Sequence, residues 1–342
     1  MTKKATLLSA IAATTVLFLP GCCIHEMPHP DAPDTPGGRN LTLRLRYDPE
    51  TPLFGEYVYD QGSVTGSRSG APLDAELPHD IRYTIKAYGM TRDGDISRDA
   101  DTTIIRTRPV AEGLDADFDI TIPDGDYQLL VWTDFVDKAT VSDKYYDTSS
   151  FDEITITDSK PHSGSNPWRD AFSGAAETAG DDATVTMARP MAKYRFISTD
   201  LRRFIEQSRS RTDGSARATS LDQYVIKMIY TRYMPCSFNM FTNRPADSRT
   251  GVSFTSRITP LSDTEAEIGF DYVFVNGNET SVAVAVEVYD SKGEMLAAIP
   301  SFDVPLKRSR LTVVKGEFLT SEASGSTGIN PGFDGDFNIE IK

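Results

Sequence analysis

The stretch DADFDITIPDGDYQLLVWTDF, residues 115–135, carries the clearest fold signal in this chain. Apolar side chains occupy every second position on either side of a central turn: Phe118, Ile120 and Ile122 before it, and Tyr127, Leu129 and Val131 after it. A period of two is typical of a β-strand with one buried face. The Pro-Asp-Gly-Asp sequence at 123–126 suits a tight reversal. The pattern therefore predicts two strands paired with each other as a β-hairpin.

The same alternation recurs along the chain. It is clean at 40–48 and at 80–90, and each of these segments is predicted to be a half-buried strand with one wet face. Further strand-like segments lie at 101–110, 150–159, 182–199, 223–235, 251–261, 265–277, 280–306, 310–321 and 336–341. Short strands separated by turns indicate all-β sandwiches. We expect antiparallel pairing, because no helices alternate with the strands as a parallel sheet would require.

One segment has a helical pattern instead. In 198–211, Leu201, Phe204 and Ile205 recur at helical spacing, and Ser198 or Thr199 could cap the N-terminus. The Ser/Arg-rich stretch at 208–220 is predicted to be a loop.

The length of the chain favours two domains, because single hydrophobic cores stop growing at roughly 250–300 residues. We place an N-terminal sandwich domain at 40–207 and a C-terminal one at 208–342. The two halves show no sequence repeat, so any similarity between them would be architectural.

The N-terminus is typical of an exported lipoprotein. Lys3 and Lys4 precede an apolar run at 5–19, which as a helix of about 1.5 Å per residue is too short for a bilayer core of about 30 Å. This pattern predicts a signal peptide at 1–21. The sequence Leu-Pro-Gly-Cys ending at Cys22 resembles a bacterial lipobox, so we expect acyl chains on Cys22 to anchor the protein in a membrane.

A Pro-rich tether is expected at 22–39. His25, Glu26 and His29 within it could suggest a metal site, but structural zinc usually takes four ligands in a closed arrangement. A solvated spacer is the favoured interpretation, and we predict neither a metal nor a cofactor.

The net charge of −15 argues against a nucleic-acid partner. The cysteines are Cys22, Cys23 and Cys236. With Cys22 lipidated, a disulfide between Cys23 and Cys236 is one alternative. The favoured alternative is that Cys236 is a small buried residue.

No enzyme motif is present, and we predict no catalytic residue. Acidic clusters at 92–101 and 334–338 resemble calcium loops, but they lack the Gly and Glu positions of an EF-hand, so solvated turns are favoured. Trp132 lies in a strongly apolar strand and is predicted to be a core residue. Trp168 lies in a polar loop and is the better candidate for an exposed contact.

Several motifs resemble a family of Bacteroides-type surface lipoproteins that is similar to fimbrillin-related anchor and accessory subunits of Bacteroidales fimbriae. They are the segments at 122–135, 188–199, 270–277, 303–320 and 328–341. The most specific is VPLKRSRLTVVKGEFLT, which is similar to a strand motif near the end of fimbrillin-type proteins. This chain has Ser309 where that family usually has Asn.

The resemblance implies two tandem transthyretin-like sandwich domains on a lipid anchor at the outer membrane, with no catalysis. It also implies assembly by donation of a β-strand into a neighbouring subunit. In this chain the candidate strand ends at the C-terminus and carries Phe337, Ile339 and Ile341 in alternation. Whether that strand is donated or pairs within its own domain is left open by the sequence.

The leading hypothesis is therefore a non-enzymatic, cell-surface lipoprotein that acts as a fimbrial anchor, accessory or adhesion subunit through protein contacts. The alternative is a glycan-binding lipoprotein, with Trp168 and the tyrosines of 142–151 as stacking platforms. A hydrolase ranks third, because paired carboxylates cannot be assigned from the sequence.

Overall fold

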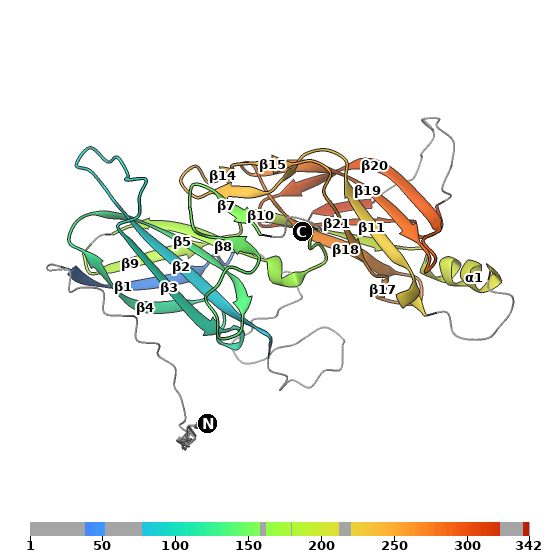
Figure 1. Cartoon of the computed structure of the whole chain (residues 1–342), viewed down its shortest axis with the longest axis horizontal. Helices are drawn as coiled ribbons and strands as arrows, with labels where there is room; N and C mark the ends of the chain where they lie inside the picture. Colours follow the sequence, from blue (N-terminus) through green and yellow to red (C-terminus); the bar gives the residue numbers. More distant parts are fainter. Residues whose placement is uncertain are drawn as a thin grey trace, which may run out of the picture. The chain divides into compact units, whose positions relative to one another are not determined.

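The computed structural model describes residues 38–51, 77–157, 162–178, 180–211, 220–321 and 338–341 (Figure 1). All of them belong to one compact unit, Gly38–Lys342. The predicted signal peptide, Cys22 and all of the tether before Gly38 lie outside the described residues. The described part is made mainly of β-strands, and its one α-helix is short, so the predicted all-β class is confirmed.

Two sheets enclose the first hydrophobic core. One has the order β4-β1-β9 and contains β1 (Gly38–Tyr47), β4 (Ala116–Pro123) and β9 (Asp182–Met187). The other has the order β3-β2-β5-β8 and contains β2 (His79–Gly89), β3 (Thr102–Pro109), β5 (Tyr127–Asp137) and β8 (Phe172–Glu177). Leu43 of β1, Tyr83 of β2 and Val185 of β9 are all fully buried between them.

Two further sheets enclose the second core. One has the order β17-β18-β10-β21-β22: β17 (Thr259–Pro260), β18 (Ala266–Phe274), β10 (Met191–Ser198), β21 (Leu311–Gly316) and β22 (Asn338–Ile341). The other has the order β16-β11-β19-β20: β16 (Ser253–Ser256), β11 (Val225–Tyr230), β19 (Glu279–Tyr289) and β20 (Met295–Lys307). Phe196, Met228 and Val284 are fully buried between these sheets.

Short elements complete the described structure. A two-stranded sheet joins β12 (Met234–Pro235) and β15 (Ser248–Arg249). A small sheet has the order β14-β13-β7-β6, with β14 (Arg244–Pro245), β13 (Ser237–Asn239), β7 (Ile154–Ile156) and β6 (Tyr146–Asp147). The single-turn 3-10 helices are η1 (Val110–Glu112), η2 (Pro167–Arg169) and η3 (Leu221–Gln223).

The two halves share one strand topology. In each half the first strand lies between an antiparallel middle strand and a parallel last strand: β4-β1-β9 in one, β18-β10-β21 in the other. The opposite sheets, β3-β2-β5-β8 and β16-β11-β19-β20, also correspond strand by strand. The similarity is therefore architectural, as expected for halves without a sequence repeat.

The expectation of purely antiparallel pairing is wrong for two pairs. β1 and β9 are parallel, and so are β10 and β21. Each pair joins the first and last long strands of one half, so the intervening strands provide the long connection that a parallel pair requires. No crossover helix is needed.

The predicted hairpin at 115–135 is wrong in its pairing, although both of its strands form. β4 pairs with β1, whereas β5 pairs with β2 and β8. Since both edges of β5 are already occupied, β4 cannot pair with it. The turn at 123–126, with Gly125 at φ +142°, therefore carries the chain from one sheet to the other.

The helix forms where its pattern predicts it, as α1 (Leu201–Arg211). Leu201 and Phe204 are buried, and the Phe204 ring packs edge-on against Tyr224 with centroids 4.8 Å apart. The residue before the helix is Asp200, whose carboxylate accepts a hydrogen bond from the Thr320 backbone N–H at 2.8 Å. That bond holds the start of α1 against the chain that follows β21.

The two halves interlock, which affects where a domain boundary could lie. Strand β10, which a boundary at 207/208 assigns to the first half, pairs with β18 and β21 of the second. Trp132 of β5 is fully buried, as predicted for a core residue, but it packs in the second core, 6.4 Å from the Phe274 ring. The division into two domains stays a prediction, and we propose that its boundary lies at 189/190.

A buried ion pair lies at this boundary. Arg189, between β9 and β10, donates to Asp170 from Nε and from Nη2, at 2.7 Å in both cases, and both side chains are 1% exposed. Arg189 Nη1 also donates to the Tyr47 hydroxyl at 3.0 Å. Burial lowers the pKa of Arg189, but the charge and hydrogen bonds of Asp170 outweigh burial, and the net pKa is raised.

Replacing Asp170 with Asn should destabilise the protein by about 3–5 kcal/mol, because a buried guanidinium then lacks its counter-charge. Asp182→Asn is the matched control, since its ion pair with Arg44 is solvent-exposed and should contribute no more than about 1 kcal/mol. Urea unfolding of both variants measures the difference. An equal decrease in the free energy of unfolding of the two variants would contradict the structural importance given to Asp170.

Candidate functional site

The C-terminal strand β22 pairs with β21 within its own half. Its register places Ile339 opposite Val314 and Ile341 opposite Thr312. Val314 and Thr312 are fully buried, whereas Ile339 is 36% exposed and Ile341 44% exposed. Directly opposed residues point to the same side of a sheet. Ile339 and Ile341 therefore point to the same side as the buried Val314 and Thr312, but they lie at the edge, where the opposite sheet does not cover them fully.

β22 is the last strand in the order of its sheet and is only four residues long. Edge strands are the positions at which sheets accept strands from other chains. Of the three residues predicted for strand exchange, Ile339 and Ile341 therefore lie together on an apolar edge. Phe337 lies outside the described residues.

Trp168 lies in η2 and is half-buried rather than fully exposed. Its ring stacks on His79 with centroids 4.3 Å apart and meets Phe135 edge-on at 5.4 Å. Tyr146, in the segment proposed as a second stacking platform, is 1% exposed, and Tyr145 is half-buried beside His79. These aromatic side chains pack against the body, so the geometry does not support a glycan platform at this place.

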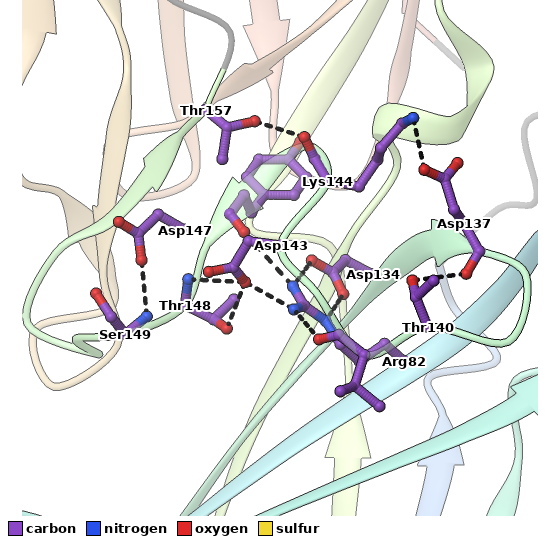
Figure 2. Close-up of polar contacts among 12 residues, drawn as sticks. Arg82, Asp134, Asp137, Thr140, Asp143, Lys144, Asp147, Thr148, Ser149 and Thr157 are labelled. Atoms are coloured by element: carbon purple, nitrogen blue, oxygen red, sulfur yellow. Dashed lines mark hydrogen bonds and ion pairs between the residues drawn. The ribbon is translucent and has the colours of Figure 1, made fainter. Parts of the chain in front are cut away.

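A charged cluster that the sequence did not reveal covers the outer face of β2. Arg82 is 1% exposed and makes two parallel hydrogen bonds with Asp134, Nε–Oδ1 at 2.8 Å and Nη2–Oδ2 at 2.6 Å. Its Nη1 donates to Asp143 Oδ1 at 2.6 Å. Figure 2 shows Arg82 between the two carboxylates, one on β5 and the other on the segment that crosses over it.

The same segment is held a second time by Lys86, whose Nζ donates to the Ser149 carbonyl at 2.6 Å and lies 4.5 Å from the centroid of the Phe151 ring. Burial lowers the pKa of Lys86. The pKa of Arg82 is raised on balance: burial lowers it, but Asp134 and Asp143 outweigh burial.

The alternation at 80–90 predicts a wet face for β2, and this is wrong, since Arg82 and Lys86 on that face are buried. The chain between β5 and β7 covers them. The opposite charges of Arg82 and Asp134 could have indicated this ion pair, because the two residues are directly opposite each other in the sheet. That pairing can be recognised only when the register of β2 and β5 is known.

The cluster has the chemistry of a clamp rather than of a catalyst, because two carboxylates satisfy the guanidinium. Cys236 is 1% exposed and burial raises the pKa of its thiol, which suits the predicted small buried residue and not a nucleophile. Within the described ranges no group of three or more His, Cys, Asp or Glu side chains could hold a metal ion. In that same part of the chain, no helix has the length and apolar character needed to cross a membrane.

Replacing Arg82 with Gln should release the crossing segment, because Asp134 and Asp143 lose their shared partner. We expect backbone amides at 141–149 to exchange with solvent at least about tenfold faster, measured by hydrogen–deuterium exchange. Arg106→Gln, on the exposed neighbouring strand β3, is the control and should leave that segment unchanged. Unaltered exchange at 141–149 in the Arg82 variant would show that the clamp does not hold the segment.

Among solved structures, this chain matches several adhesion and fimbrial proteins over most of its length at low sequence identity. A candidate cell adhesion protein from Bacteroides ovatus ATCC 8483 is 12% identical and has a TM-score of 0.43, with 89% of this chain and 97% of that one covered. The fimbrial anchor protein Mfa2 from Porphyromonas gingivalis is 10% identical, with a TM-score of 0.39 and the same coverage. The tip fimbrial protein Mfa3 from that organism is 8% identical, with a TM-score of 0.39, and covers 89% of this chain and 99% of its own.

Fimbrial proteins of the class that the sequence motifs resemble are thus among the structural neighbours. No curated protein sequence matches the chain. One family matches residues 37–342, nearly all of the sequence, and it is described as a family of unknown function, DUF6562. The chain belongs to the DUF6562 family.

Proposed function

We propose that this protein is a non-enzymatic, lipid-anchored surface subunit that joins a fimbrial or adhesive assembly by strand addition. The observation that carries the proposal is the edge strand β22, with Ile339 and Ile341 exposed on an apolar rim. The shared topology of the two halves supports a further assignment of each half as a transthyretin-like sandwich.

Strand addition at this edge is physically simple. β22 is held on β21 over four residue pairs, from Lys315–Asn338 to Thr312–Ile341. A partner strand can add beside β22 and continue the sheet through main-chain hydrogen bonds. Burial of the two isoleucines then favours the assembled state, at about 25 cal/mol per Å² of apolar surface removed from water. Alternate side chains then set the register.

The anchor is assigned to Cys22 on the sequence pattern of the signal peptide and lipobox. One acyl chain gives only marginal membrane binding, so the two or three chains of a bacterial lipoprotein are needed for a stable anchor. With a net charge of −15, the chain gains no attraction to anionic lipid headgroups. We therefore propose that attachment to the outer membrane depends on the acyl chains alone.

A photo-crosslinking residue placed at Ile341 in living cells should form an adduct with another surface protein. The control position is Val141, which is 52% exposed but lies outside the edge. The double substitution Ile339→Lys and Ile341→Lys should weaken partner capture about tenfold or more, because it places two charges where apolar burial is required. Identical adducts from Ile341 and Val141, or adducts only within the chain, would contradict strand addition at β22.

Replacing Cys22 with Ala should abolish metabolic labelling with palmitate and release the protein from the membrane fraction. Cys23→Ala and Cys236→Ala are matched controls, and both should retain the label. Labelling that persists in the Cys22 variant, or that disappears in the Cys23 variant alone, would show that the lipidated residue is assigned wrongly.

A further inference from the structure

A cleft of about 950 Å³ opens between elements of the two halves. Its walls include the loop between β2 and β3, strands β5, β8 and β9, and the residues that follow β13 and β20. The polar and aromatic side chains that line it include Arg98, Gln128, Phe241, Asn243, Asn278 and Arg308. Small-molecule sites in proteins are usually clefts of roughly 300–1,000 Å³, and this cleft lies at the upper end of that range.

Arg308 lines this cleft and has only neutral hydrogen-bond partners. It is half-buried, and its guanidinium donates only to neutral oxygens: the Arg189 carbonyl at 3.2 Å, the Asn243 carbonyl at 3.3 Å and Asn243 Oδ1. Among the described residues no carboxylate forms an ion pair with it. Burial lowers its pKa, and no neighbouring acid offsets that effect.

Three arginines that are more deeply buried than Arg308 each have a counter-charge. Arg82, Arg169 and Arg189 are each 1% exposed, and each pairs with a buried carboxylate. Arg98, which also lines the cleft, pairs with Asp152 at 3.1 Å. Arg308 is therefore a cation that lines the cleft with no counter-charge among the residues that the structure describes. A half-buried cation gains more from an anionic partner than an exposed one does.

The rest of the lining restricts what that anion can be. The amides of Gln128, Asn243 and Asn278 both donate and accept hydrogen bonds, which suits the paired hydroxyls of a sugar. Asp95 also lines the cleft and is exposed, and the whole chain is acidic. These negative charges disfavour a polyanion, whereas a single acidic group can pair with Arg308.

An extended peptide fits the cleft less well. Ser173 of β8 and Ala188 exchange backbone hydrogen bonds at 2.9 and 3.0 Å, so the strands at this place are already closed against each other. Of the apolar lining residues, Leu130 and Met240 are 3% and 7% exposed, whereas Ile96 is 36% exposed. A peptide strand would therefore find the backbone groups of Ser173 and Ala188 already paired.

We propose that this cleft binds a saccharide bearing a single carboxylate, such as a terminal sialic or hexuronic acid, with Arg308 holding the carboxylate and the amides holding hydroxyls. The proposal places glycan recognition away from Trp168. It does not depend on strand addition, because β22 is not part of the cleft lining.

The test is calorimetric titration of the full chain in detergent. The probes are 3′-sialyllactose, a disaccharide ending in glucuronic acid, lactose, a heparin hexasaccharide and a short peptide with a free terminal carboxylate. We expect at least one single-acid sugar to bind, lactose not to bind, and heparin and the peptide to bind no better than the acidic sugar. Arg308→Gln should weaken that binding about tenfold or more.

Two further variants separate recognition from folding. Arg310→Gln is the matched control, because Arg310 donates to the Glu50 carbonyl and does not line the cleft, and it should leave affinity unchanged. Asn278→Ala removes an exposed amide of the cleft and should weaken binding without changing the thermal unfolding midpoint. Absence of binding to both acidic sugars would overturn the proposal. So would equal affinity in the Arg308 and Arg310 variants, or a preference for the peptide.

Discussion

The buried ion pair between Asp170 and Arg189 is the constraint on which the arrangement of the two cores depends. Arg169, the neighbour of Asp170, donates to Asp271 of β18 at 2.9 Å, deep in the second half. Asp170 itself is bound to Arg189, which also bonds Tyr47 of the first strand. Two consecutive residues of one loop thus attach to both halves, and the cleft and the junction of β9 with β10 take their geometry from this attachment.

The buried charges at this junction are stable because each one pairs with an opposite charge or a hydrogen-bond donor. Asp271 accepts from Arg169, from Tyr230 at 2.7 Å, and pairs with His162 at 2.6 Å. Burial raises the pKa of Asp271, but the charges of His162 and Arg169 outweigh burial, so its net pKa is lowered. An aspartate with a lowered pKa contributes stability above about pH 4 and loses it as pH falls further, so this junction is intact at neutral pH.

The sequence predicted the elements better than their partners. Period-two alternation located β4 and β5, and the spacing of Leu201 and Phe204 located α1, because each depends on local burial of one face. Pairing is different, since it depends on which sheet edges remain available. The Pro-Asp-Gly-Asp turn suits a hairpin, but β2 and β8 already occupy both edges of β5. The burial of Arg82 was missed for a related reason, because it depends on a segment crossing from outside the strand.

The two candidate sites also differ in how far the sequence predicts them. The rim of β22 was visible in the alternation of Ile339 and Ile341, whereas the cleft joins segments far apart in the sequence. Arg308 lies in the motif that carries the family resemblance, and its place beside the cleft depends on the next residue. Ser309 has φ +60°, a left-handed conformation that Asn adopts more readily than most residues, which fits the Asn of the motif that this segment resembles. The Ser309 N–H donates to the Met191 carbonyl at 2.9 Å, and its hydroxyl donates to the Arg189 carbonyl at 3.0 Å. This strained turn is therefore fixed to the start of β10, and Arg308 is held beside the cleft, where no carboxylate in the described part of the chain pairs with it.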